Sequence, residues 1–134
     1  MYGDPLTPLE HDAIATILRH DHPIADALRA QLDVCRIKSR RFTGVGFFTD
    51  IVPQGLAIEG IGHLELGDAH AEVDGVAHGA GFVLFVADGM LAMLEGFTYD
   101  DPWPNVVGTY AVRPLDHIDP PDRRALDRAK RRRR

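Results

Sequence analysis

Residues 81 to 96 read G-F-V-L-F-V-A-D-G-M-L-A-M-L-E-G, and this stretch decides the fold that the sequence predicts. Two apolar runs flank Asp88-Gly89, and an Asp-Gly pair between such runs is typical of a type I′ turn, because both central residues need a positive φ. We therefore expect a β-hairpin with a two-residue turn. Its register places Glu95 opposite Phe82.

Both faces of this hairpin are apolar in sequence. A strand pair of this kind is expected in the middle of a sheet that is covered on both sides, or in a sheet that curls into a partly closed barrel. One helix pair can cover only one of the faces. The other face then needs strand curvature or a second subunit.

The residues before the strands predict two short helices. Thr7-Pro8-Leu9-Glu10 has the pattern of a capped helix start, in which Thr7 and Glu10 form a capping box. Apolar residues recur at helical spacing after it, and Pro23 is well placed to begin a second helix. A brief link between two amphipathic helices indicates an αα-hairpin.

Period-two patterning predicts strands near 34–42, 45–51, 56–66, 69–73, 76–87, 90–98 and 105–112. The elements together predict an α+β fold, with the N-terminal αα-hairpin packed on a strongly bent, mainly antiparallel sheet of about five to seven strands. We expect residues 1–113 to form one domain. Residues 114–134 are expected to be a linker and a mobile basic tail.

Charge divides the chain into two unequal parts. Residues 123–134 hold eight of the fifteen bases against one acid, and residues 1–122 hold seven bases and nineteen acids, a balance of 7 − 19 = −12. An acidic body attracts basic partners and repels nucleic acid, so we expect contact with nucleic acid only through the tail.

Composition limits the location and the chemistry that we expect. Cys35 is the only cysteine, which excludes an intrachain disulfide, and no signal peptide is visible. The longest apolar run, 82–87, is too short to span a bilayer. We expect a cytoplasmic protein without a membrane role. Cys35 and the only serine, Ser39, lack a nucleophile pattern, so we expect no catalytic residue and no cofactor.

The seven histidines raise the question of a metal site. His70 and His78 are the best pair in sequence. A hairpin turn at Asp74-Gly75 would place them on opposite faces of the sheet, with His78 opposite Ala71. The sequence therefore predicts no metal site.

Residues 94 to 104 read L-E-G-F-T-Y-D-D-P-W-P and are the most suggestive surface segment. Aromatic groups on a stiff loop beside carboxylates are typical of a hot spot for a basic partner. In the alternative interpretation, Phe97 and the only tryptophan cap the core, and the two adjacent aspartates form a turn. The predicted partner-binding residues are Glu95, Tyr99, Asp100, Asp101 and Trp103.

Three motifs carry a resemblance to a known group of proteins. They are R-R-F-T-G-V-G-F-F-T (residues 40–49), G-F-V-L-F-V-A-D-G-M-L-A-M-L-E-G-F-T-Y (residues 81–99) and W-P (residues 103–104). With the capped helix pair before them, they resemble small, mostly uncharacterised bacterial α+β domains, some of them proposed as antitoxin or immunity proteins. The resemblance covers residues 7 to 112 and implies an α+β fold and a protein-binding role.

The leading hypothesis is a non-enzymatic binding protein that neutralises a basic protein partner, such as a toxin, as an immunity protein or antitoxin would. The alternative is a small-ligand pocket in the curved sheet, which could also be an active site. It would be lined by Phe82, Leu84, Met93 and Glu95. A third hypothesis is a homodimer joined through the uncovered face of the sheet.

Overall fold

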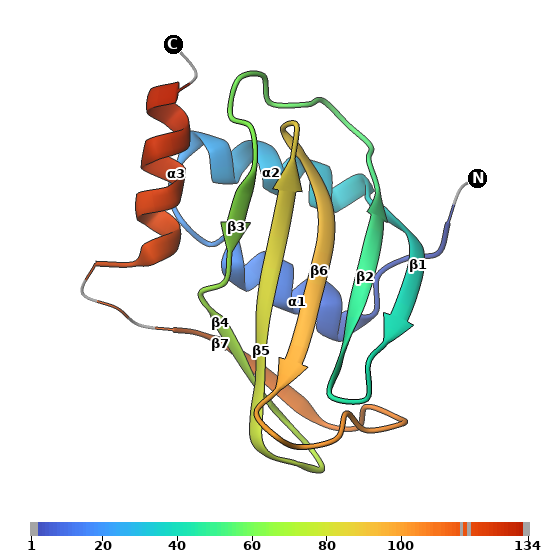
Figure 1. The fold of residues 1–134 in the computed structure, drawn as a ribbon. Helices are drawn as coiled ribbons and strands as arrows, with labels where there is room; N and C mark the ends of the chain where they lie inside the picture. The colour runs from blue at the N-terminus through green and yellow to red at the C-terminus, as the bar shows by residue number, and fades with distance from the viewer. Residues whose placement is uncertain (1–2, 116, 118, 133–134) are drawn as a thin grey trace.

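The computed structural model describes residues 3–115, 117 and 119–132. It confirms the α+β class, because the helix pair α1 (Pro8–Ile17) and α2 (Pro23–Val34) precedes an antiparallel sheet (Figure 1). The capping box of α1 is also confirmed. The Glu10 N–H donates to Thr7 Oγ1 at 3.2 Å, and the Thr7 N–H donates to Glu10 Oε1 at 2.8 Å.

The sheet has seven antiparallel strands in the order β1-β2-β6-β5-β4-β7, and β3 pairs with the far end of β5. The strands are β1 (Arg36–Phe42), β2 (Gly46–Val52), β3 (Leu64–Leu66), β4 (Ala69–Val73), β5 (Val76–Ala87), β6 (Met90–Thr98) and β7 (Tyr110–Pro114).

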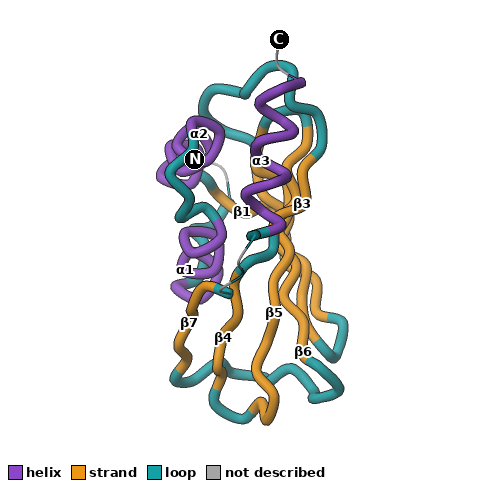
Figure 2. Tube along the Cα trace, turned by 90° about the vertical axis from the view of Figure 1, so that its left-hand side faces the viewer, coloured by secondary structure: helices purple, strands orange, loops and turns teal. Residues whose placement is uncertain are grey.

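The helix pair covers one face of this sheet (Figure 2). The β4–β7 end bends toward α1, where the Tyr110 hydroxyl donates to Asp12 Oδ2 at 2.7 Å. Apolar side chains of both helices meet those of the central strands and form one core. Its largest fully buried members include Ile14, Ile17, Ile24, Leu28, Phe82, Leu84, Leu91 and Leu94.

The turn at Asp88-Gly89 forms as predicted, but the strand register beyond it differs from the prediction. Both residues have positive φ, and the first two pairs of the hairpin match the prediction. A β-bulge then leaves Ala92 without a direct partner, so that Phe85 pairs with Met93. Glu95 therefore lies opposite Val83, and its predicted position opposite Phe82 is wrong.

The bulge changes which side chains share a face. Phe82 and Leu84 are buried in the core beneath the helices, whereas Met93 and Glu95 lie on the other face of the sheet and are half-buried. The four side chains predicted to line one pocket are thus divided between the two faces. Among the described residues no helix covers the other face of the hairpin, so its cover by a second subunit stays a prediction.

Two predicted strands are shorter or displaced. Most of the segment 56–66 is a loop, because the positive φ of Gly60 and Gly62 breaks the extended backbone, and only the β3 residues pair. β7 begins at Tyr110, later than the predicted position 105.

The basic C-terminal segment is not the mobile tail that the sequence led us to expect. Residues Pro121–Arg132 form α3, which packs along β3 through the buried side chains of Leu126 and Ala129 (Figure 1). Arg132 Nη2 also donates to the carbonyl oxygen of Ile61 at 3.0 Å. The predicted tail includes residues 133–134, and the predicted linker includes 116 and 118, which lie outside the described residues.

Among the described residues, no helix combines the length and the apolar composition that crossing a membrane requires.

Candidate functional site

The face of the sheet opposite the two N-terminal helices is the broadest candidate surface (Figures 1 and 2). Two cross-strand rows, Phe48–Glu95–Val83 and Asp50–Met93–Phe85, run across β2, β6 and β5. All six side chains are half-buried. We call the surface that these rows form, together with Phe97 and Tyr99, the outer sheet face.

Aromatic rings and charges are interleaved on the outer sheet face. The Tyr99 residue is 47% exposed, and its ring meets the edge of Phe97 with centroids 5.6 Å apart. The Arg41 guanidinium lies 5.1 Å from the centroid of the Phe48 ring, and its Nε lies 3.6 Å from Asp50 Oδ2. Within the part of the chain that the structure describes, Glu95 has no ion-pair partner.

The structure does not gather the five predicted partner-binding residues on one surface. Glu95 and Tyr99 belong to the outer sheet face. Asp100 is exposed in a turn with a φ of 81°, and Asp101 Oδ2 lies 3.5 Å from His78 Nδ1 and accepts the His78 N–H at 3.3 Å. Trp103 packs elsewhere.

Trp103 lines a pocket on the helix side of the sheet. Its ring meets Phe47 edge to face with centroids 5.0 Å apart, and the backbone N–H of Trp103 donates to the Gly44 carbonyl oxygen at 2.8 Å. The cavity measures about 480 Å³ and has mainly apolar walls. We call it the Trp103 pocket; its walls include Leu9, Glu10, Arg40, Phe42, Phe47, Trp103, Val107 and Tyr110.

An ion pair between Arg40, whose side chain is 25% exposed, and the buried Glu10 lines the Trp103 pocket. Arg40 donates from Nε and Nη2 to the two carboxylate oxygens of Glu10 at 2.8 and 2.7 Å, and the Thr49 hydroxyl donates to the same carboxylate. Burial raises the pKa of Glu10, but the hydrogen bonds from Arg40, Thr49 and Thr7 outweigh it and hold the pKa below its usual value.

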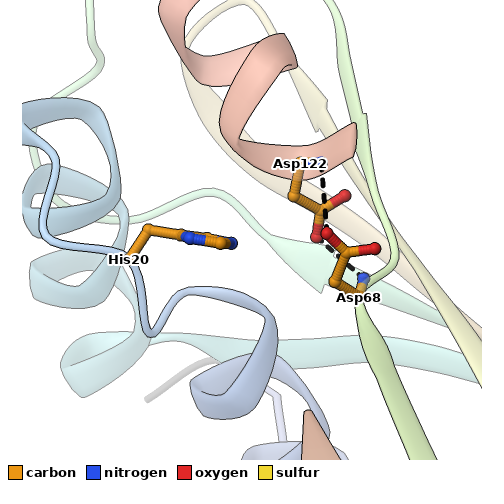
Figure 3. Close-up of side chains that lie close together, drawn as sticks. All are labelled: His20, Asp68 and Asp122. Atoms are coloured by element: carbon orange, nitrogen blue, oxygen red, sulfur yellow. Dashed lines mark hydrogen bonds between the residues drawn. The ribbon is translucent and has the colours of Figure 1, made fainter. Parts of the chain in front are cut away.

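A third group of polar side chains, which we call the His20 cluster, lies where three distant segments meet (Figure 3). His20 comes from the link between α1 and α2, Asp68 from the turn between β3 and β4, and Asp122 from the first turn of α3. One candidate ligand atom from each residue lies within 4.8 Å of the others. In addition, His117 Nε2 lies 3.4 Å from Asp68 Oδ1.

Backbone groups hold the two carboxylates in place. Asp122 Oδ2 accepts from the backbone N–H of Asp68 at 2.8 Å, and Asp68 Oδ2 accepts from the backbone N–H of Asp122 at 3.2 Å (Figure 3). Asp122 Oδ2 also accepts from the backbone N–H of Gly67 at 3.0 Å. Burial raises the pKa of the Asp122 carboxyl, and the neighbouring Asp68 adds to this effect, although backbone N–H bonds from Gly67 and Asp68 oppose it. Burial also lowers the pKa of His20.

Sequence reasoning missed the His20 cluster. Its members are far apart in the chain and share no local spacing, so only the packing of α3 against the β3–β4 turn brings them together. The histidine pair that the sequence favoured, His70 and His78, does not belong to it. His70 stacks beside Tyr99, and Ala71 pairs with Ala80 instead of His78 because a bulge interrupts β4 and β5.

Comparisons with protein families, curated proteins and solved structures find no match to this chain.

Proposed function

We propose that this protein is a non-enzymatic, cytoplasmic binding protein that holds a basic protein partner on its outer sheet face, in the manner of an antitoxin or immunity protein. The observation that carries the proposal is the outer sheet face itself, where aromatic and apolar side chains lie half-buried and none of the described helices lies above them. Solvent-facing apolar patches with polar groups at the rim are typical of protein-binding sites.

The charge of the body supports a basic partner. Residues 1–122 carry a formal charge of 7 − 19 = −12, and with the basic residues of 123–134, most of them on α3, the whole chain remains acidic at −5. On the outer sheet face, Arg41 lies beside Asp50, whereas the carboxylate of Glu95 sits between apolar side chains without a cation near it among the described residues. A lysine or arginine of the partner would form an ion pair with this carboxylate, and the negative electrostatic potential of the protein would accelerate association.

Placing a photoreactive phenylalanine analogue at position 97 tests the proposal. In cells that produce the protein at natural levels, we expect position 97 to cross-link to a second protein of basic isoelectric point. The same analogue at Leu56, which is 90% exposed in a loop, should give no such product. Glu95→Lys should weaken the purified complex at least tenfold, or about 1.4 kcal/mol, and added salt should slow its formation.

Glu59→Lys serves as the matched control because Glu59 is exposed in the loop before β3, outside the outer sheet face. It should leave the affinity unchanged. If position 97 cross-links only to a second copy of the chain, the outer sheet face is a homodimer interface and not the binding site of a basic partner. Equal effects of the two charge reversals would contradict the proposal.

The Trp103 pocket favours a second candidate function, the binding of a small ligand. Its volume lies within the range of about 300 to 1,000 Å³ that is usual for ligand sites. Arg40 uses only two of its five N–H donors on Glu10 among the described residues, so donors remain for an anionic group. The pocket thus suits an aromatic or aliphatic molecule that carries an acid.

Anilinonaphthalene sulfonate, an aromatic anion, is a suitable probe of this second candidate. We expect one saturable site that quenches the fluorescence of Trp103, the only tryptophan, by energy transfer. Phe42→Ser removes a ring that lines the pocket and should weaken binding about tenfold, the equivalent of about 1.4 kcal/mol. Phe48→Ser, on the outer sheet face, should not change it. If both substitutions weaken binding equally, the probe does not bind in the Trp103 pocket.

A further inference from the structure

We propose that the His20 cluster binds one divalent transition-metal ion of the zinc type, with His20, Asp68 and Asp122 as ligands and His117 as the fourth. This site is separate from the outer sheet face and from the Trp103 pocket. The ion would join the helix link, the β3–β4 turn and α3.

The first argument concerns charge. Asp68 and Asp122 are each 4% exposed, and their carboxylates lie side by side (Figure 3). Among the residues that the structure describes, no arginine or lysine lies within ion-pair distance of either carboxylate. Arg19 is near but donates to the backbone carbonyl oxygen of Asp68 at 2.9 Å, and His117, whose side chain is 41% exposed, lies 3.4 Å from Asp68 Oδ1. Two adjacent buried carboxylates are unfavourable unless a cation or a proton compensates them.

The second argument concerns an unsatisfied nitrogen. Nε2 of His20 is buried and has no hydrogen-bond partner among the described residues. The ring points toward the two carboxylates (Figure 3), and one of its nitrogens lies within 4.8 Å of a carboxylate oxygen of each. Buried polar atoms almost always have a partner. A neutral imidazole offers one nitrogen lone pair to a metal, so an ion bound between the carboxylates would satisfy this nitrogen as well.

The third argument concerns geometry: three candidate ligands lie together and a fourth lies beside one of them. Metal–ligand bonds of about 2.0 to 2.2 Å place ligand atoms about 3.4 Å apart. The ligand atoms of His20, Asp68 and Asp122 lie within 4.8 Å of one another, so they would have to move closer together around an ion. His117 Nε2 lies 3.4 Å from Asp68 Oδ1 but outside this group of three, so its side chain would have to turn toward the ion to become the fourth ligand. The hydrogen bonds from Gly67 and Asp68 to Asp122 would orient that carboxylate and still leave oxygen lone pairs for the metal.

The donor set selects the class of metal. Calcium and magnesium prefer oxygen ligands alone, whereas imidazole nitrogen with carboxylate oxygen suits zinc and its transition-metal neighbours. The rival explanation is a proton shared by the two carboxylates, which needs no ion. The two explanations predict different responses to added metal.

Cobalt and zinc titrations of the chelator-treated full chain, prepared without a polyhistidine tag, test the proposal. We expect one Co²⁺ per chain with the visible absorption of a tetrahedral site, and we expect Zn²⁺ to displace it. Zinc at 100 times its Kd should raise the Tm by about 5 to 10 °C. His20→Asn should weaken binding at least tenfold and remove the tetrahedral absorption.

His11→Asn is the matched control, because the His11 side chain is 52% exposed on α1, away from the His20 cluster. It should bind cobalt and zinc as the parent chain does. His20→Asn keeps both aspartates that tie α3 to the body, so circular dichroism should show a folded protein. Absence of cobalt and zinc binding below millimolar concentration, equal binding by the two variants, or binding of magnesium alone would overturn the proposal.

Discussion

Replacing Arg40 with methionine is expected to lower the free energy of unfolding by about 3 to 5 kcal/mol at pH 7, the usual effect of removing one partner of a buried ion pair. Glu10 is 2% exposed, and Arg40 is its only cationic partner among the described residues. Without Arg40 the Glu10 carboxylate would stay buried with only Thr49 and Thr7 as hydrogen-bond donors. Urea unfolding at pH 7 measures the loss.

The same loss should become smaller in acid. The folded pKa of Glu10 lies below its ordinary value of 4.5, so the ion pair stabilises the fold fully above that pH and is lost as the pH falls through the folded pKa. In Arg40→Met, burial without the guanidinium raises the pKa of Glu10, and protonation then removes the uncompensated charge. The difference between the two proteins should therefore be largest near pH 7, start to decrease above pH 4.5 because of the raised pKa in the variant, and decrease further below pH 4.5 as the parent loses its ion pair.

Two further variants separate charge from packing. Lys38→Met, at an exposed position on the same strand, should change stability by less than about 0.5 kcal/mol. Glu10→Gln combined with Arg40→Met should be more stable than Arg40→Met alone, because no charge then remains buried. If Arg40→Met loses the same free energy of unfolding at pH 7 and at pH 4, the loss does not come from the buried charge of Glu10.

The Glu10–Arg40 pair shows how far local sequence patterns predict a site. The capping box could be predicted because Thr7 and Glu10 are three positions apart and both contact the same helix start. The partner on β1 could not, because it lies 30 positions away and a bulge between Ile37 and Ser39 interrupts the alternation of β1 side chains. The His20 cluster depends on the same kind of long-range contact.

The β5–β6 hairpin shows the corresponding limit for the fold. The Asp-Gly pair determined the turn, and the antiparallel pairing followed from it. The bulge at Ala92 has no signature, because alanine and the adjacent Leu91 and Met93 are all compatible with either face. One extra residue reverses the face of every later side chain. The predicted environment of Glu95 was therefore wrong, although the β5–β6 hairpin itself was predicted correctly.

α3 was missed for a different reason. Its sequence is dominated by arginine, and basic runs are usually solvated. Yet Leu126 and Ala129 are three positions apart, which places them on one helical face, and Asp122 fixes the helix start to the backbone of Gly67 and Asp68. Two apolar residues and one buried carboxylate thus hold α3 on the body.

The two turns share the same Asp-Gly sequence, but we expect a glycine-to-alanine substitution to destabilise one of them much more than the other. Gly89→Ala should lower the free energy of unfolding by about 3 kcal/mol or more, because strain and lost hydrogen bonds add to each other. Gly89 has a φ of 76°, and an added Cβ would lie 2.0 Å from the carbonyl oxygen of Ile58. The Gly89 carbonyl also accepts from the Ile58 N–H at 3.0 Å and from Gln31 Nε2 at 2.9 Å, so moving this turn would break both bonds.

Gly75→Ala is the matched variant, since Gly75 occupies the same place in the other Asp-Gly turn with a φ of 87°. An added Cβ would meet no atom within 4 Å there, so only the backbone strain remains, about 1 kcal/mol. Parallel urea titrations of both variants give the difference. Equal losses would mean that backbone conformation alone determines the cost, and that the contact of the β5–β6 turn with Ile58 contributes nothing to stability.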